Sequence, residues 1–200
     1  GGVAGGPPRR NERLGVPARS RLVAASPQMA IWGSRFAPLS NWVMQSTPAR
    51  WLLEALYGLD RRMPPPRFAR VTFRDWWRRR AKQRDDRPSV VYFVDTWTNF
   101  HEPHVGIATV RVLEALGYSV VVPPTVCCGR PALSKGMLND ARKLAEKNVA
   151  LLAPYADRGV PIVCAEPSCT STMLDEWPQL VRHDKTRVIS EHAMMIETLV

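Results

Sequence analysis

Four cysteines are the residues of this chain best suited to redox or metal chemistry. Cys127 and Cys128 are adjacent and precede Gly129, while Cys164 and Cys169 follow about forty residues later. Thiolates bind soft metal ions and take part in electron transfer. In a chain that shows no export signal, such clusters are more often metal-binding or redox-active than disulfide-bonded. We therefore expect Cys127, Cys128 and Cys169 to form one thiol-rich site in a reducing, cytoplasmic compartment.

The elements that must position these cysteines are short strands alternating with helices. Apolar runs predict strands at residues 89–94, 118–122 and 160–163, and amphipathic patterns predict helices at 103–116, 138–153 and 168–176. This alternation predicts an α/β fold, a small parallel three- to four-stranded Rossmann-like sheet with flanking helices. We expect Pro154 to end the second helix, and Met194 and Met195 to belong to the core of a last helix.

The predicted topology places the chemistry at one edge of the sheet. In open parallel sheets, ligands bind beyond the carboxyl ends of the strands. These ends are Asp95–Thr96, Cys127–Gly129 and Glu166–Cys169. Gly129 permits a tight turn that points two neighbouring cysteines inward. Cys169 should lie in the first turn of a helix, where the helix dipole lowers the pKa of a thiol.

Polar residues beside the cysteines suit more than one role. Asp95 could orient a loop amide or act as a helix N-cap, and Arg130 could offset thiolate charge or contact an acidic neighbour. Cys164 could take part in the thiol site, but it is equally suited to be a buried apolar residue of the third strand. His101 and His104 have a spacing known from zinc sites, but no further ligands accompany them, which favours solvated loop histidines.

The positive charge of the chain lies wholly in its first half. Residues 1–90 contain 18 lysines and arginines against 6 acidic residues, whereas residues 91–200 contain 10 against 12. We expect a flexible lead-in at 1–20, a basic, tryptophan-rich helical segment and connector at 21–86, and a cysteine-rich α/β domain at 87–200. No run of 18 uninterrupted apolar residues occurs, so we expect no membrane-spanning helix.

Two helices are predicted in the basic segment. Thr47 as N-cap with Pro48 predicts the start of one helix and Gly58 its end, and Thr72 with Asp75 predicts a capping box for the other. The second helix combines tryptophan and arginine, which could contact nucleic acid, an anionic membrane surface or a neighbouring domain. We favour docking on a neighbouring domain over peripheral membrane association, and no nucleic-acid motif accompanies the helix.

Residues 89–200 resemble the cysteine-rich CCG domain of iron–sulfur oxidoreductases, the type found in heterodisulfide reductase and in the iron–sulfur subunits of glycolate oxidation. With the connector at residues 59–73, they are most similar to the C-terminal region of FAD-linked oxidases. The segments that carry the resemblance are Phe93-Val94-Asp95-Thr96-Trp97-Thr98-Asn99, Cys127-Cys128-Gly129-Arg130-Pro131 and Glu166-Pro167-Ser168-Cys169.

The resemblance implies that the three matched cysteines hold an iron–sulfur cluster or form a redox-active thiol centre. The cofactor-binding residues that it implies are Cys127, Cys128, Gly129 and Cys169, with the cysteines as metal ligands. The supporting residues are Asp95, Thr96, Arg130 and Glu166. Thr96 stands where cluster-binding relatives have a cysteine, and Glu166 where some have the first cysteine of a CxxC pair. Three matched thiols therefore remain against the usual four per cluster.

These observations lead to two hypotheses of different classes. In the first, the chain is an electron-transfer module of an FAD-linked oxidoreductase that acts on a 2-hydroxy-acid-type substrate, in the cytoplasm or on the inner face of the membrane. Its partners are then a flavin-containing and a ferredoxin-like domain or subunit, with FAD bound elsewhere and no nucleic acid. In the second, it is a non-catalytic docking domain without a cluster. Because the family usually has two CCG domains and this chain lacks an initiator methionine, we expect it to be part of a longer protein.

Overall fold

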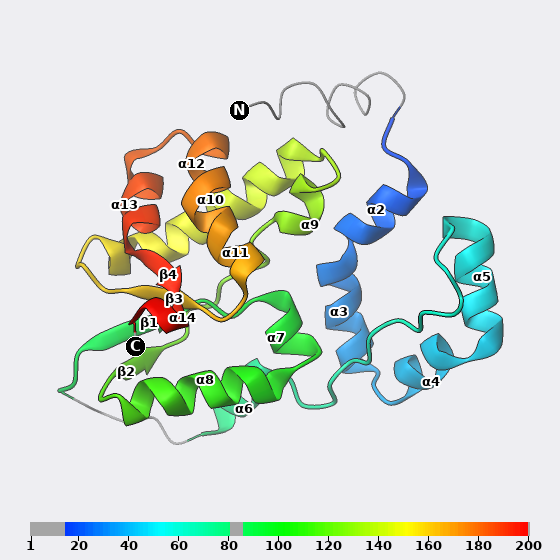
Figure 1. Cartoon of the computed structure of the whole chain (residues 1–200), viewed down its shortest axis with the longest axis horizontal. Coiled ribbons are helices and arrows are strands. Elements are labelled where there is room, and N and C mark those ends of the chain that lie inside the picture. The colour runs from blue at the N-terminus through cyan, green and yellow to red at the C-terminus, as the bar shows by residue number, and fades with distance from the viewer. Residues whose placement is uncertain (1–14, 81–85, 200) are drawn as a thin grey trace.

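A small parallel sheet forms the centre of the computed structural model, which describes residues 15–80 and 86–199 (Figure 1). The sheet has the order β2–β1–β3–β4, and all three strand pairings are parallel. Its strands are β1 (Ser89–Tyr92), β2 (Ser119–Val121), β3 (Ile162–Cys164) and β4 (Ala193–Met195). The expected α/β fold with a small parallel sheet and flanking helices is therefore confirmed.

Helices cover both faces of this sheet (Figure 1). One face packs against α6 (Phe73–Arg79), α8 (Pro103–Ala115) and α14 (Ile196–Leu199), and the other against α10 (Leu138–Ala156) and α13 (Asp184–His192). Two short helices, α7 (Thr96–Phe100) and α9 (Arg130–Leu133), follow β1 and the cysteine pair. After β3, α11 (Pro167–Ser171) continues through a π-helical turn at Thr172–Glu176 into α12 (Trp177–Leu180).

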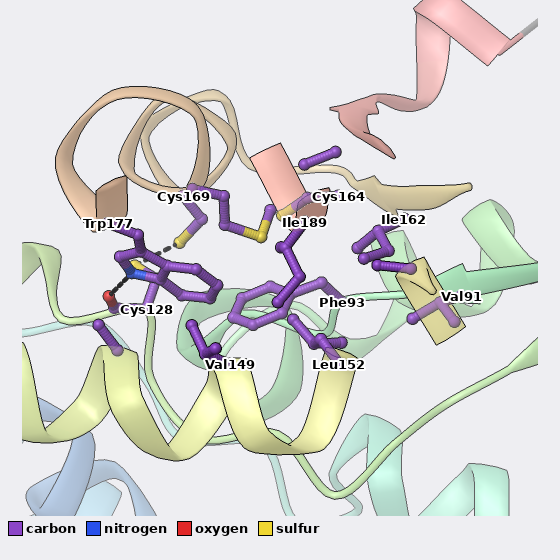
Figure 2. Close-up of a cluster of buried hydrophobic side chains, with 14 of the residues drawn as sticks. Val91, Phe93, Cys128, Val149, Leu152, Ile162, Cys164, Cys169, Trp177 and Ile189 are labelled. Atoms are coloured by element: carbon purple, nitrogen blue, oxygen red, sulfur yellow. Dashed lines mark hydrogen bonds between the residues drawn. The ribbon is translucent and has the colours of Figure 1, made fainter. Parts of the chain in front are cut away.

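Alternating residues of the central strand divide the core into two clusters. Val91 and Phe93 point to one face, and Val90, Tyr92 and Val94 point to the other, as the period of a strand requires. We call the first the thiol-face cluster, because it contains all four cysteines. Figure 2 shows three of them, Cys128, Cys164 and Cys169. The second, the aromatic-face cluster, contains Phe73, Val90, Tyr92, Val94, Val110, Leu113 and Val163.

The helices from α2 to α5 lie to one side of the sheet: α2 (Ala18–Ala24), α3 (Ser26–Arg35), α4 (Leu39–Gln45) and α5 (Thr47–Tyr57) (Figure 1). Of these, only α3 has buried residues, which are Ala30, Gly33 and Ser34. Large apolar side chains of this region remain exposed, with Trp42 at 72% the most exposed tryptophan. None of the described helices is both long enough and apolar enough to cross a membrane.

Several helix boundaries agree with the sequence pattern. Gly58, at φ +64°, ends α5, and Thr72 and Asp75 form the expected capping box of α6. Trp76 and Trp77 of α6 pack against the aromatic-face cluster, which is the docking that we favoured for this helix. Residues 1–14 of the expected lead-in and residues 81–85, beyond α6, lie outside the described residues.

Three local expectations were wrong. The N-cap of α5 is Ser46, whose Oγ accepts a hydrogen bond from the amide of Ala49 at 3.4 Å, so Thr47 is already helical. Pro154 lies inside α10, because proline removes only its own amide hydrogen bond, and Asp157 N still donates to Ala153 O at 2.9 Å. Met194 and Met195 belong to β4, a three-residue strand that pairs with β3 and carries no β-branched residue in its sequence.

Candidate thiol site

Two cysteines from separate loops meet within the core. The Sγ atoms of Cys128 and Cys169 lie 2.9 Å apart, although the residues are 41 positions apart in the chain. Cys128 follows β2 through an extended segment, and Cys169 lies in the first turn of α11, directly after β3. Both side chains are almost completely buried, with 2% and 7% of their surface exposed (Figure 2). The topology of the parallel sheet brings these loops to the same edge.

The other two cysteines extend this contact in both directions. Cys127 interacts with Cys128 and with Thr96, and Cys169 interacts with Cys164, and these interactions shift the pKa of Cys127 and of Cys169. Cys164 also accepts a hydrogen bond from the amide of Glu166 at 3.4 Å and is fully buried at the end of β3. All four cysteines are free thiols. They form a line of contacts in the order Cys127, Cys128, Cys169 and Cys164.

Among Cys127, Cys128 and Cys169, Cys128 is the thiol that ionises most easily. Hydrogen bonds from Cys127 and Cys169 lower the pKa of Cys128 well below its ordinary value and outweigh the effect of burial. The same hydrogen bonds raise the pKa of both donors, and for Cys169 the contact with Cys164 and burial add to the increase. We expected the helix dipole to lower the pKa of Cys169. That expectation was wrong, because the contacts with Cys128 and Cys164, together with burial, all favour the protonated thiol.

Two buried side chains hold the cysteine loop by its backbone. Asn148 of α10 accepts a hydrogen bond from Val126 N at 2.9 Å and donates to Val126 O and Cys127 O at 3.3 Å and 3.0 Å. The indole Nε1 of Trp177 donates to Cys128 O at 2.9 Å (Figure 2). Both side chains have 0% of their surface exposed. Buried carbonyl groups need such partners, so these contacts determine where the two cysteines lie.

The residues after the cysteine pair shape the turn and connect it to the next helix. Gly129 adopts φ +95°, and a Cβ at this position would lie 3.3 Å from Ala141 O. The turn therefore requires both the left-handed conformation and the small size of glycine. Arg130 forms an ion pair with Glu176, so its acidic neighbour belongs to the same chain.

Asp95 and Glu166 act as N-caps of the two helices that approach the cysteines. Asp95 Oδ1 accepts a hydrogen bond from Thr98 N at 2.9 Å, and Glu166 Oε1 accepts from the amide and hydroxyl of Ser168 at 3.3 Å and 2.8 Å. Asp95 is 1% exposed and its Oδ2 has no hydrogen-bond partner among the described residues. Burial raises the pKa of Asp95, with hydrogen bonds from Thr98 acting in the opposite direction.

The chemistry of this donor set fits an iron–sulfur group, which proteins hold through cysteine thiolates. Across residues 15–80 and 86–199, no three His, Cys, Asp or Glu side chains surround a single metal-ion position. Thiolates around a tetrahedral ion with metal–sulfur bonds of about 2.3 Å lie roughly 3.8 Å apart. The 2.9 Å contact between Cys128 and Cys169 is therefore contracted, and their sulfurs must separate by about 1 Å to share a metal.

Three residues that position the site were missed in the sequence. Asn148 interrupts the apolar stripe of α10, and a buried polar residue in such a stripe is the one signal that could have identified it. Arg74 of α6 donates to Pro123 O, Thr125 O and Thr125 Oγ1 at 2.9–3.0 Å, and so fixes the segment before the cysteines. Neither Arg74 nor Trp177 carries a local pattern that predicts these long-range contacts.

Comparison with known protein families matches residues 90–174 to the family described as a cysteine-rich domain, CCG. The chain is 30% identical over 169 residues to a subunit of anaerobic glycerol-3-phosphate dehydrogenase from Escherichia coli, the one designated C, which covers 83% of this chain and 43% of the relative. It is 36% identical over 96 residues to lactate utilization protein A of Bacillus velezensis, covering 48% and 38% of the two chains.

Another relative, matched over a shorter stretch, is a subunit of fumarate reductase (CoM/CoB) from Methanothermobacter marburgensis, the one designated B. It is 34% identical over 89 residues, or 44% of this chain and 17% of the relative. The chain thus spans less than half the length of each of these curated relatives. No solved structure matches the chain. The region matched to the family begins within β1 and includes the cysteine pair and Cys169.

Proposed function

The chain carries a cysteine-rich domain of the CCG family, and we propose that it is an electron-transfer module of an oxidoreductase. The observation that carries this proposal is the buried contact between Cys128 and Cys169, which joins two loops of the sheet edge into one thiol site. The names of the relatives support it, because two of them are subunits of a dehydrogenase and a reductase. Such relatives also support a role within a larger assembly.

In this proposal, Cys127, Cys128 and Cys169 are the ligands of an iron–sulfur cluster. A bound cluster would supply one-electron redox chemistry, and the protein supplies ligation, orientation and exclusion of water. Trp177 and Asn148 hold the backbone of the cysteine pair, while Phe93 and Met173, both fully buried, keep water from the sulfurs. The low pKa of Cys128 favours the thiolate form that ligation requires.

We extend the proposal to the wider system. The substrate is a 2-hydroxy acid or a similar alcohol, which the name of lactate utilization protein A supports. FAD and a ferredoxin-like cluster belong to a separate domain or subunit, and the assembly lies in the cytoplasm or on the inner face of the membrane. The organisation proposed for this chain places the connector before residue 87 and the cysteine-rich domain at residues 87–200.

Anaerobic reconstitution of the whole chain with iron and sulfide tests this proposal. We expect bound iron and sulfur-to-iron charge-transfer absorption, both lost in Cys128→Ser and in Cys169→Ser. Ser190→Ala on α13 serves as a control that should retain both signals. Cys164→Ala completes the set, because retained iron restricts the ligands to the three matched cysteines, whereas lost iron adds Cys164 as a fourth. Absence of iron from the reconstituted wild-type chain would contradict the proposal.

A docking domain without a cluster is the second candidate, and one observation favours it. The helices α3, α4 and α5 expose Trp32, Trp42 and Trp51, with 59%, 72% and 57% of their surface accessible. Exposed aromatic residues of this kind are enriched where proteins bind one another. This candidate predicts that partner binding persists in Cys128→Ser, whereas the electron-transfer proposal predicts that cluster-dependent reduction is lost. Assays of partner binding and of cluster-dependent reduction, each on the wild-type chain and on Cys128→Ser, distinguish the two candidate functions.

A further inference from the structure

A cleft whose lining contains no cysteine is lined by arginines. It has a volume of about 1040 Å³ and lies where α3 approaches α6 and α7. Four arginines line it: Arg35 from α3, Arg70 from the connector, and Arg74 and Arg78 from α6. Asp75 is the one acidic residue in the lining, and it already pairs with Arg78 and caps α6. The cleft therefore carries a surplus of positive charge.

Arg74 is a partly buried cation without a counter-charge. Its guanidinium donates only to neutral oxygens, those of Pro123 and Thr125, and within residues 15–80 and 86–199 it forms no ion pair. Burial lowers the pKa of Arg74, and the positive charge of nearby Arg78 lowers it further. Burying an unpaired charge is costly, and an anion in the cleft would offset that cost.

A second polar group that lines the cleft, the hydroxyl of Ser34, lacks a hydrogen-bond partner among the described residues. Ser34 of α3 has 6% of its surface exposed, lines the cleft, and its Oγ forms no hydrogen bond among the described residues. Unsatisfied buried hydroxyl groups are uncommon in folded proteins, and a ligand is one explanation for them. The hydroxyl could donate to an anion held by the surrounding arginines.

Apart from Thr72 and Asn99, the remaining lining of the cleft is apolar or aromatic. Ile31, Phe100, Val122 and Pro124 contribute aliphatic and aromatic surface, and Trp77 lies beside Arg78. Small-molecule sites typically combine such walls with a few convergent polar groups in volumes of about 300–1,000 Å³. Arginine recognises both carboxylate and phosphate oxygens with paired N–H donors. Charge and shape together therefore favour an anion that carries an apolar portion.

We propose that this cleft binds a small organic anion, a carboxylate or phosphate ester, through Arg35, Arg70, Arg74 and the Ser34 hydroxyl. The site is distinct from the thiol site and does not depend on whether a cluster binds there. The cleft adjoins the segment from Pro123 to Thr125 that leads to the cysteine pair. Arg74 lines the cleft and also donates hydrogen bonds to this segment.

Isothermal titration calorimetry on the whole chain tests the site, with phenyl phosphate, benzoate and inorganic phosphate as probes at low chloride concentration. We expect saturable one-to-one binding of an aromatic anion and weaker binding of inorganic phosphate, because only the former fills the apolar walls. The double variant Arg35→Gln/Arg70→Gln should bind roughly tenfold or more weakly, since charge-assisted hydrogen bonds are lost. The double variant Arg19→Gln/Arg79→Gln removes the same charge from exposed positions outside the cleft and should bind as the wild type does.

Ser34→Ala adds a readout that a purely structural role would not produce. We expect weaker binding of phenyl phosphate with an unchanged or higher melting temperature of the free protein, because the lost hydroxyl has no partner there. Equal losses in the two double variants, or the absence of saturation, would overturn the proposal. Tighter, cleft-dependent binding of an acidic peptide would overturn it as well, by assigning the cleft to a protein partner. Iron content, measured in parallel, reports separately on the thiol site.

Discussion

The two faces of the sheet differ in what their side chains can do. The thiol-face cluster contains four cysteines and Trp177, which donates a hydrogen bond to the cysteine loop. Asn148 lies beside this cluster and donates a hydrogen bond to the same loop. The aromatic-face cluster is built from aliphatic and aromatic residues, with Phe73 against Tyr92 in an edge contact at a centroid distance of 5.6 Å. Both faces are equally buried, since alternate residues of β1 serve each of them.

This difference shows that burial alone does not identify a functional face. Both clusters exclude water and stabilise the fold through apolar contact. Only the thiol-face cluster also buries thiols, and a contact between residues far apart in the chain joins two of them, Cys128 and Cys169. Mutations on the aromatic face should therefore change stability alone, whereas mutations on the thiol face should change stability and thiol chemistry together.

The largest expected effects come from removing one large aromatic residue from each face. Phe73→Ala and Trp177→Ala each delete a fully buried ring and should lower the free energy of unfolding by about 3–5 kcal/mol. Urea denaturation measures this loss. Only Trp177→Ala should also change iron retention after reconstitution, because only Trp177 donates a hydrogen bond to Cys128 O.

Trp177→Phe serves as the milder variant if either alanine variant fails to fold. It keeps most of the ring and removes the hydrogen bond to the cysteine loop. Iron retention that falls equally in Phe73→Ala and Trp177→Phe at matched stability would show that the two faces do not differ as described.

Gly129→Ala tests how closely the thiol face constrains its backbone. The new Cβ would meet Ala141 O at 3.3 Å at a φ of +95°, so we expect a loss of about 1–3 kcal/mol in unfolding free energy and weaker iron retention. Gly117→Ala is the matched control, because Gly117 has a φ of +87° but nothing within 4 Å of the new Cβ. Its cost should be only the conformational strain, about 1 kcal/mol. Equal losses in the two variants would contradict the close contact with α10.

Asp95→Asn tests the cost of a buried carboxyl group next to the cysteines. Burial raises the pKa of Asp95 in the folded protein, so the folded state binds its proton more tightly, and stability falls as the pH rises above the unfolded pKa of 3.8. The variant lacks this loss. We expect it to be more stable than the wild type at pH 7, by on the order of 1 kcal/mol, with the difference shrinking as the pH falls to 3. Urea denaturation of cluster-free protein at both pH values measures it; a difference that is independent of pH would contradict this assignment.

The smallest effects are expected from ion pairs at the surface. Arg130→Gln removes the ion pair between Arg130, whose side chain is 41% exposed, and Glu176, whose side chain is 25% exposed. The loss in unfolding free energy should be about 0–1 kcal/mol. Arg187→Gln removes a more exposed pair with Glu191 on α13 and should cost still less. Thermal unfolding at low and high salt compares them. A cost above about 2 kcal/mol for Arg130→Gln would mean that this pair determines the position of the cysteine loop.

The sequence alone determined the fold class and the loops that carry the cysteines. Hydrophobic periodicity, capping residues and glycine turns are properties of contiguous residues, so strands at β1, β2 and β3 and the capping box of Thr72 and Asp75 could be predicted. Boundaries were less certain where two signals competed, as at Pro154 and at Ser46. The three-residue strand β4 lacked a pattern, because its strand conformation comes from pairing with β3.

Only the tertiary structure decided the chemistry of the site. The pKa order of Cys128 and Cys169, the support from Trp177 and Asn148, and the arginine-lined cleft all depend on distances between residues far apart in the chain. Electrostatic and hydrogen-bond energies change steeply over a few ångströms, whereas local sequence patterns carry no information about such distances.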